Sequence, residues 1–292
     1  MTSMMPGAVA LRTSILADNP RCWELRGPRN RDIQDSIAQA ANITIFARRQ
    51  GALDDAKKVV VASRLKDTQE VNVILLDLSD TPQVDTVFRS QPRPADILYC
   101  VAGGTQNECG FLNGTQPSDL ESCVKKNYFT CLSSTGYVEN LDRRRQLRQI
   151  VFVNSAAAFF AIPGYTAYTP SKTAVRALAD VLRMECLRYS GLSSTYTIHI
   201  AFPSNFLTFA FFQEQEKKPQ LTKQIEGTEG SISDHKKKYP TAEKVATQIV
   251  AGVKKGDFAI CENSLEAALL WGRTWLGHRR REGGGLLIRC MR

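Results

Sequence analysis

Short apolar runs rich in β-branched residues alternate with helical stretches through most of this 292-residue chain. Near-continuous apolar runs of this length are typical of parallel strands that are buried on both faces. The runs lie at residues 43–47, 71–77, 97–101, 149–154, 196–201 and 257–261, and the helical stretches include 53–66, 81–90, 118–137 and 241–253. This alternation predicts an α/β protein built on a single doubly wound parallel sheet with helices on both faces.

The segment 154–172, NSAAAFFAIPGYTAYTPSK, places three reactive side chains around the end of one such strand. Ser155 directly follows the apolar run 149–154, Tyr168 comes thirteen residues later, and Lys172 follows four residues after the tyrosine. A four-residue spacing puts Tyr168 and Lys172 on one face of a helix. Pro170 suits the first turn of that helix. Ligands bind at the carboxyl ends of strands in open α/β sheets, so we expect Ser155 to lie at a binding site.

The three side chains together suit proton transfer at a carbonyl oxygen. A phenol has a pKa of about 10, and a neighbouring ammonium pulls the pKa toward neutral pH. The serine hydroxyl can hold the substrate oxygen while hydride moves at carbon. A Tyr-x-x-x-Lys pair alone also fits a half-buried tyrosine with a solvated lysine. The serine at the end of the strand is what favours the catalytic interpretation. Tyr165 is the weaker candidate because Thr169 stands four residues beyond it.

Ser155, Tyr168 and Lys172 resemble the catalytic set of the short-chain dehydrogenase/reductases. The words IFARR (45–49), CVAGGT (100–105) and AYTPSKTAVRALADVLRMECLRY (167–189) resemble the 3-ketodihydrosphingosine reductase branch, over about 32–276. The resemblance implies a Rossmann fold and NADPH-dependent reduction of the ketone of 3-dehydrosphinganine to sphinganine. In it Tyr168 donates the proton, Lys172 lowers its pKa and binds the nicotinamide ribose, and Ser155 holds the ketone oxygen. Asn127 matches the family's asparagine that supports a water relay. Considered without the resemblance, Asn127 is simply a polar residue on a helix.

Arg48 and Arg49 follow the strand 43–47, with no acid before Asp54. Arginine forks suit a ribose 2′-phosphate, whereas an acid would bind the 2′-hydroxyl, so we expect NADPH rather than NADH. The alternative is two solvated arginines. By resemblance, further cofactor contacts come from Asp77 and Leu78 beside the adenine, Ala102 and Gly103 at the ribose or nicotinamide, and Ser204 and Asn205 over the carboxamide, with Thr208 as the family's threonine. For Asp77 a helix cap is the alternative.

The first thirty-one residues depart from the family pattern. The run 9–16 is a poor strand, and the segment 25–31, LRGPRNR, offers only Gly27 where the family has a glycine-rich phosphate turn before the helix expected at 32–41. The first strand and this turn are therefore degenerate. A start that differs from the native one, impaired cofactor affinity and a degenerate paralogue all explain the departure, and we favour the first. We divide the chain into a poorly defined segment 1–31, a Rossmann-type domain 32–277 and a disordered basic tail 278–292.

Residues 206–240 show no clear periodicity and are interpreted as a long lid or substrate loop. Its phenylalanines could cover a lipid chain and Lys217, Lys218 and 236–238 could meet a membrane; a mobile solvated loop is the alternative. Segment 264–276 is amphipathic with a basic flank, which suits a membrane-surface helix, a dimer interface or core packing equally. The expected partners are a hydrophobic sphingoid ketone, a peripheral membrane contact and a second copy of the chain.

Composition narrows the remaining possibilities. A formal charge of +9 suits an anionic ligand, an anionic membrane or nucleic acid, but the charge is dispersed without an aromatic–basic pattern, so we expect no nucleic acid. The eight cysteines lack a C-x-x-C pair, which indicates reduced thiols and no metal. We interpret 142–148 as a solvated basic turn and His199 as a packed core residue. No membrane span or secretory signal is evident, and the resemblance implies the cytosolic face of the endoplasmic reticulum membrane, otherwise the cytoplasm.

Two other functions stay open at this point. One is a short-chain reductase of another hydrophobic ketone. The other is a non-catalytic binding or scaffold protein that has kept the fold and lost the phosphate-binding turn.

Overall fold

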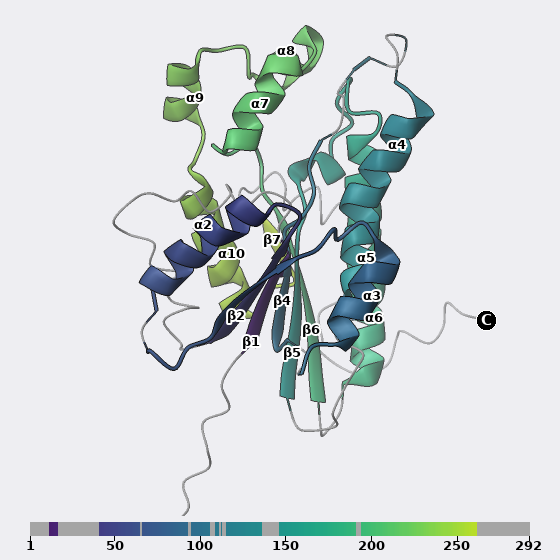
Figure 1. Cartoon of the computed structure of the whole chain (residues 1–292). Coiled ribbons are helices and arrows are strands. Elements are labelled where there is room, and N and C mark those ends of the chain that lie inside the picture. Colours follow the sequence, from purple (N-terminus) through teal and green to yellow (C-terminus); the bar gives the residue numbers. More distant parts are fainter. Residues whose placement is uncertain are drawn as a thin grey trace, which may run out of the picture.

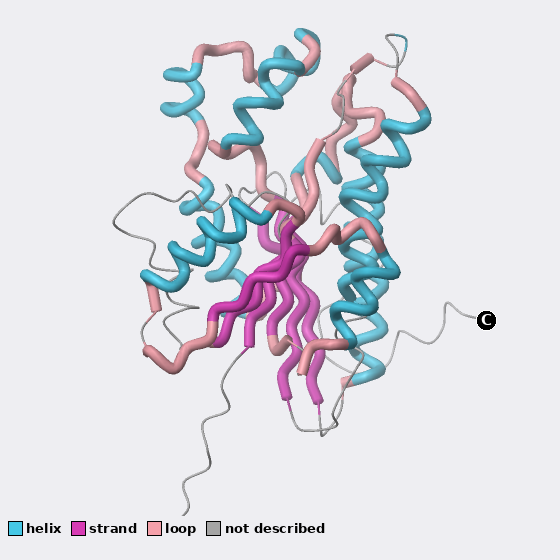
Figure 2. Tube along the Cα trace, in the orientation of Figure 1, coloured by secondary structure: helices cyan, strands magenta, loops and turns pink. Residues whose placement is uncertain are grey.

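The chain folds around one seven-stranded sheet in which every paired neighbour is parallel (Figures 1 and 2). The computed structural model describes residues 12–16, 41–64, 66–92, 95–105, 109–110, 112, 115–135, 146–190 and 194–261. The strand order is β3-β2-β1-β4-β5-β6-β7. The strands are β1 Arg12–Leu16, β2 Asn42–Ala47, β3 Val71–Leu75, β4 Ile97–Cys100, β5 Gln146–Val153, β6 Ser194–Phe202 and β7 Ala259–Cys261. The predicted doubly wound parallel sheet is confirmed.

Strand β1 comes from the weakest pattern in the sequence yet lies in the middle of the sheet. It pairs with β2 on one side and β4 on the other, and Leu16 stands opposite both Phe46 and Cys100. The chain therefore reverses its winding direction between β1 and β4, which is where doubly wound folds bind their ligands. The segment 17–40 lies outside the described residues, as do 262–292. The expected phosphate turn, the helix 32–41, the amphipathic segment 264–276 and the tail stay predictions.

Helices cover both faces of the sheet (Figure 1). On one face α2 (Gln50–Ala62) and α10 (Ala242–Lys255) pack through apolar residues such as Leu53 and Val245. The other face carries α3 (Thr81–Arg89), α4 (Pro117–Val124), α5 (Thr130–Thr135) and α6 (Tyr168–Tyr189). Its core includes Phe152 and Phe202, both fully buried. Each such side chain contributes about 1.5–3 kcal/mol through burial, so the two cores fix the strand ends in place.

The helical stretch expected at 118–137 is interrupted. A π-helical turn, η3 (Lys125–Phe129), separates α4 from α5. The wide turn carries Asn127, which is fully buried and donates from Nδ2 to the Cys123 carbonyl oxygen at 3.0 Å. Such turns are frequent at functional sites because one extra residue re-aims a side chain.

The prediction that 206–240 lacks secondary structure is wrong. This region forms three short helices, α7 (Phe209–Lys217), α8 (Gln220–Glu226) and α9 (Ile232–Lys238), which stand together beyond one end of the sheet in Figure 1. Seven to nine residues are too few for a clear hydrophobic period. Their caps are nevertheless in the sequence: Thr208 accepts from the Phe211 N–H at 2.9 Å, and Ser231 and Asp234 form a capping box.

A second correction concerns the turn expected at 142–148. Residues from Gln146 onward belong to β5, and the Arg148 side chain is only 4% exposed. Its Nη1 donates to the Ala95 carbonyl oxygen at 2.9 Å and to Asp96 at 3.1 Å. These partners satisfy the buried guanidinium, so the arginine can be part of the strand. They are distant in sequence, so the local pattern does not indicate them.

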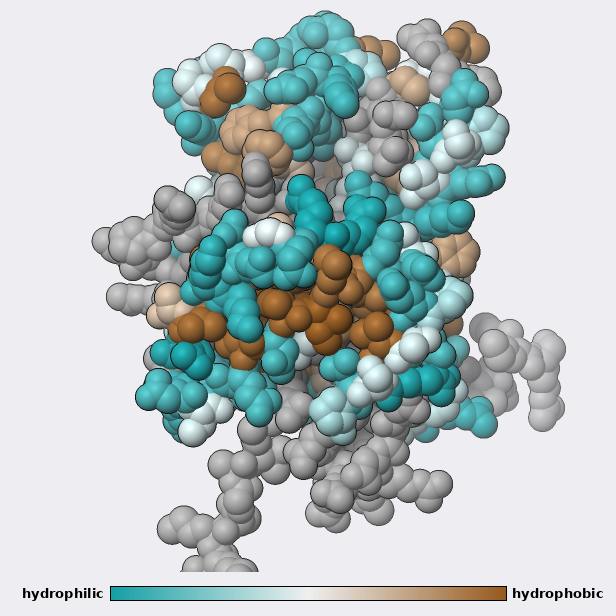
Figure 3. All heavy atoms as spheres, viewed as in Figure 1, coloured by the Kyte–Doolittle hydropathy of each residue, from teal (hydrophilic) through white to brown (hydrophobic). Residues whose placement is uncertain are grey.

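The remaining expectations for the core agree with the structure. His199 is buried in β6, and its Nδ1 donates to the Asp257 carbonyl oxygen at 2.7 Å. The cysteines within the described ranges are free thiols. An apolar band crosses the middle of the face in Figure 3, over the edge strand β3, where Leu75 is 55% exposed. Within the described ranges no helix has the length and apolar character needed to cross a bilayer.

Candidate active site

A cavity of about 1160 Å³ opens where β2, β4, β5 and β6 end. The start of α6, the segment after β6, and helices α7 and α8 complete its wall. Eight predicted site residues line this cavity, namely Arg48, Arg49, Gly103, Ser155, Tyr168, Lys172, Ser204 and Asn205. Four others do not belong to its lining, namely Asp77, Leu78, Ala102 and Asn127.

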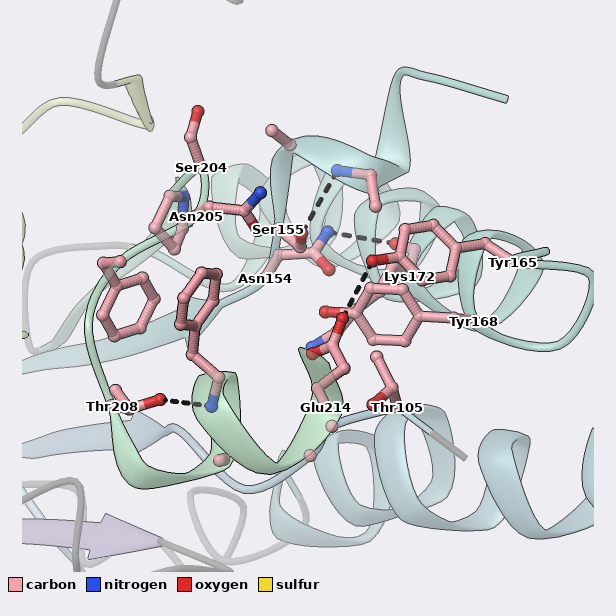
Figure 4. Close-up of a pocket in the computed structure, with 18 of the residues that line it drawn as sticks. Thr105, Asn154, Ser155, Tyr165, Tyr168, Lys172, Ser204, Asn205, Thr208 and Glu214 are labelled. Carbon is pink, nitrogen blue, oxygen red and sulfur yellow. Dashed lines mark hydrogen bonds between the residues drawn. The ribbon is translucent and has the colours of Figure 1, made fainter. Parts of the chain in front are cut away.

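Tyr168 and Lys172 lie within the first two turns of α6, on the same face of the helix. The Lys172 Nζ is 5.6 Å from the centre of the Tyr168 ring. Asn154, at the end of β5, donates from Nδ2 to the Lys172 carbonyl oxygen at 3.0 Å. This bond ties the first turn of the helix to the strand end, and so fixes Lys172 relative to Ser155 (Figure 4).

Lys172 is a buried cation, with 5% of its surface exposed. Burial lowers the pKa of Lys172 below its ordinary value, Cys131 and Cys123 oppose this shift, and the neighbouring Lys126 adds to it. No carboxylate of the described residues lies within ion-pair distance of its ammonium. The ammonium is therefore held in a setting that favours giving up a proton or sharing one with a neighbour.

Ser155 leaves β5 in an extended conformation and begins a short 3-10 turn, Ala156–Ala158. Its Oγ accepts from the Ala157 N–H at 3.2 Å, which leaves the hydroxyl proton available to a ligand. The next N–H, of Ala156, donates to the Pro203 carbonyl oxygen at 3.0 Å and brings the segment after β6 to this edge. That segment supplies Ser204 and Asn205 to the cavity (Figure 4).

Asn127 lies behind the cavity wall and holds the segment after β4. Its Oδ1 accepts from the Gly104 N–H at 2.9 Å, and its Nδ2 donates to the Gly104 carbonyl oxygen at 3.0 Å. A Cβ at Gly103, whose φ is +149°, would lie 2.5 Å from Asn127 Oδ1 and 3.3 Å from Lys172 Nζ. Only glycine fits between these two side chains, so Gly103 allows Asn127 and Lys172 to approach one another.

One part of the cavity lining, which we call the basic wall, is rich in cations. Arg48 and Arg49 follow β2 and are exposed at the start of α2, and Lys126 donates to the Thr105 carbonyl oxygen at 3.3 Å. These three cations and Lys172 all line the cavity and suit an anionic ligand such as a dinucleotide. Asp77 accepts from the Ser79 N–H at 2.9 Å, and the cap of α3 is Asp80 instead. Leu78 is buried in the core, so the proposed adenine contacts of both residues stay predictions.

Sequence reasoning missed a buried charged cluster around Tyr165 and helices α7 and α8. The Tyr165 hydroxyl lies 2.9 Å from a Glu214 oxygen and 2.7 Å from a Glu226 oxygen, and its single proton is shared between the two carboxylates. Lys218 pairs with both carboxylates, at 2.6 Å to Glu214. The expectation that Lys218 meets a membrane is wrong, because its side chain is fully buried among these acids. Only the spacing of Glu214 and Lys218, four residues apart on a helix, could have indicated the pair.

The cluster changes the proton affinity of its members. Burial and the two glutamates raise the pKa of Tyr165 far above its ordinary value. Burial alone would lower the pKa of Lys218, but Glu214 and Glu226 outweigh it and raise the pKa. Both groups therefore keep their protons at neutral pH. Among the described residues no group of three or more potential ligands is arranged for a metal ion.

These features define a class of protein, and comparison with known sequences agrees. The profile of the family described as short chain dehydrogenase matches residues 33–216. The chain belongs to the short-chain dehydrogenase family.

Within that family the chain is similar to reductases of sphingoid ketones. It is 31% identical to the 3-dehydrosphinganine reductase of Danio rerio over 222 residues, which are 75% of this chain and 62% of that one. It is 31% identical to the 3-ketodihydrosphingosine reductase of Bos taurus over 224 residues, with 75% and 63% covered. A PIGF/3-ketodihydrosphingosine reductase fusion protein of Schizosaccharomyces pombe is 29% identical over 236 residues, 79% of this chain and 44% of the fusion. The chain thus spans less than two thirds of these relatives.

Solved structures share the fold at low identity. Levodione reductase superposes with a TM-score of 0.70 at 17% identity, covering 88% of this chain and 98% of that chain. A short-chain dehydrogenase from Sphingobium yanoikuyae in complex with NADPH gives 0.67 at 16% identity, with 93% and 98% covered. One from Burkholderia phymatum in complex with NAD gives 0.66 at 14% identity, with 95% and 99% covered.

Proposed function

We propose that this chain is an NADPH-dependent reductase that converts the ketone of 3-dehydrosphinganine into the alcohol of sphinganine. The observation that carries the proposal is the meeting of Ser155, Tyr168 and Lys172 at one cavity at the carboxyl edge of the sheet. The similarity to reductases of this ketone supports the substrate. The activity is proposed because the alignments cover only part of those relatives.

The residues around the cavity fit a reduced dinucleotide phosphate. The basic wall of Arg48, Arg49, Lys126 and Lys172 suits phosphate groups, and two adjacent arginines at the end of β2 suit a 2′-phosphate. The solved relatives include complexes with NADPH and with NAD, so the preference for NADPH rests on the arginines. We propose further contacts from Asp77, Leu78, Ala102, Gly103, Ser204 and Asn205.

The chain's own side chains supply the proton and position the ketone. A bound nicotinamide supplies hydride donation to the carbonyl carbon. The Ser155 hydroxyl donates to the carbonyl oxygen, and Tyr168 gives that oxygen its proton as negative charge develops there. Lys172 stabilises the phenolate left behind, and in its place beside Gly103 it can reach the cofactor ribose. Asn127 fixes the segment after β4 and supports the path by which the proton is replaced.

Two alternatives predict different measurements. A reductase of another hydrophobic ketone would ignore 3-dehydrosphinganine and reduce other members of a ketone panel. A scaffold protein without a phosphate turn would show no saturable NADPH binding in a folded sample. The decisive experiment is NADPH oxidation by the purified chain with 3-dehydrosphinganine; turnover supports the proposal, and turnover only with other ketones contradicts it.

We also propose a peripheral location on the cytosolic face of the endoplasmic reticulum membrane, and pairing with a second copy of the chain. Exposed Ile232 and the exposed lysines 236–238 on α9 support contact with an anionic surface. Co-sedimentation with anionic vesicles tests this location, and binding that is equal on neutral vesicles would contradict the electrostatic part.

A further inference from the structure

Helices α7 and α8 bring two acidic side chains to the cavity. Glu214 and Glu226 both line it, with 19% and 8% of their side chains exposed. They flank Tyr165, whose ring centre is 5.4 Å from that of Tyr168 in an edge-on contact. The carboxylates are thus about one ring away from the proposed proton donor.

Glu226 has hydrogen-bonding capacity beyond its contacts with Tyr165 and Lys218. An ionised carboxylate accepts about four hydrogen bonds. The bonds described for Glu226 are one from the Tyr165 hydroxyl and one from the Lys218 ammonium. Two carboxylates and one ammonium leave this group with an excess of negative charge, in contrast to the basic wall. A substrate cation placed beside these carboxylates would balance that charge.

An independent feature of the same cavity also calls for a donor. Asn154 is 5% exposed, and its Oδ1 has no hydrogen-bond partner within the described part of the chain. In Figure 4 the Asn154 side chain points toward the space between Ser155 and the hydroxyl ends of Tyr165 and Tyr168. A buried acceptor without a donor carries a desolvation penalty, which a ligand N–H placed there would remove.

We infer that Glu214, Glu226 and Asn154 form a subsite for a substrate ammonium group placed on the carbon next to the reacting ketone. This inference rests on the proposed function, and it names the residues that select an amino ketone over a plain ketone. An ammonium has three N–H donors, which match acceptors on more than one side. The nitrogen is two covalent bonds from the carbonyl carbon, so a ketone held by Ser155 and Tyr168 brings it to the neighbouring wall.

The test compares two water-soluble, short-chain ketones in the NADPH assay. One carries the 2-amino group of 3-dehydrosphinganine, and the other has hydrogen in its place. The wild-type chain should have a kcat/KM at least about tenfold higher for the amino ketone, the worth of one charge-assisted hydrogen bond. Glu214→Gln keeps the size and an acceptor for Tyr165 but removes the charge, and should abolish most of this preference. Glu226→Gln should act likewise, and carries the test if the first variant does not fold.

A matched control is Glu185→Gln on the exposed side of α6, which changes the same charge away from the cavity and should keep the preference. Equal losses for both ketones in the two cavity variants would show that the cluster only holds α7 and α8 in place, and would overturn the inference. So would a wild-type chain that does not distinguish the ketones.

A binding measurement separates failure of this inference from failure of the proposed function. Calorimetry compares a short-chain sphinganine with its analogue lacking the amine. If neither ketone is reduced, the proposed function fails, yet a tenfold preference for the amine that Glu214→Gln removes would still support the subsite. Equal binding of the two compounds would overturn it.

Discussion

Two tyrosine–lysine pairs lie at or behind the cavity wall, with nearly the same ammonium-to-ring distance but different surroundings. Lys172 Nζ lies 5.6 Å from the Tyr168 ring centre, and Lys218 Nζ lies 5.5 Å from that of Tyr165. The two lysines are 5% and 4% exposed. Burial lowers the pKa of Lys172, whereas Glu214 and Glu226 overcome burial and raise the pKa of Lys218.

The difference lies in the carboxylates and assigns the two pairs opposite roles. Lys218 and Tyr165 keep their protons because two acids hold them, so that pair stabilises the fold around α7 and α8. Lys172 has thiols and another lysine nearby, and Tyr168 is only partly buried at the cavity. Lys172 is the lysine whose pKa is lowered, so its pair with Tyr168 is the one suited to proton transfer.

The largest effect should follow from removing the Tyr168 hydroxyl. Tyr168→Phe keeps the ring and its contact with Tyr165 but leaves no proton donor, so turnover should fall roughly 10³-fold. NADPH affinity should change little, which fluorescence titration checks. The control is Tyr189→Phe at the exposed end of α6, which should keep turnover. Near-normal turnover by Tyr168→Phe would show that the two pairs do not differ in this way.

The second effect should appear in stability. Lys218→Met leaves two largely buried carboxylates without their shared ammonium, and this should lower the free energy of unfolding by about 3–5 kcal/mol. Urea denaturation measures the loss. Lys217→Met changes the exposed neighbour and should stay within about 0.5 kcal/mol. A loss below about 1 kcal/mol for Lys218→Met would remove the structural role assigned to this pair.

The contrast between the pairs also shows what the sequence can predict. Tyr168 and Lys172 are four residues apart on a strongly helical segment that follows a clear strand, so local pattern was enough to bring them together. The Tyr165 pair depends on Glu214 and Glu226, which are 49 and 61 residues away in sequence. A local hydrophobic period cannot predict a contact between residues so far apart. The sequence therefore predicts, wrongly, that Lys218 is exposed at the surface.

The same reasoning explains the outcomes for the fold. Six apolar strands and the main helices follow from periodicity, because each buries its own apolar face. Strand β1 had a weak pattern and is specified mainly by its neighbours β2 and β4. The short helices α7–α9 are specified by caps and by packing on the cavity rather than by a hydrophobic period. Arg148 is tolerated within β5 because its guanidinium donates to Asp96, which directly precedes β4.

The third prediction extends the comparison of charge to the basic wall. Arg48→Ala combined with Arg49→Ala should weaken NADPH binding roughly 10- to 100-fold, because charge-assisted bonds to a 2′-phosphate are lost. NADH, which lacks that phosphate, should lose much less affinity. Fluorescence titration of both cofactors measures the ratio, with Lys57→Ala on the exposed face of α2 as the control. Equal losses for the two cofactors would contradict a 2′-phosphate site.

The smallest effect is a pH dependence that should have opposite sign for the two lysines. A lysine whose pKa is lowered in the folded state destabilises the fold below that pKa, and the penalty fades as the pH rises toward its ordinary value of 10.5. Lys172→Met removes the penalty, so its unfolding free energy relative to wild type should decline as pH rises from 7 toward 10.5. A raised pKa contributes stability that is present below 10.5 and is lost only as pH rises through the folded-state value. The deficit of Lys218→Met should therefore stay constant over the same range. Urea titrations at several pH values decide between the two behaviours; parallel curves for both variants would mean that the acids do not distinguish the lysines.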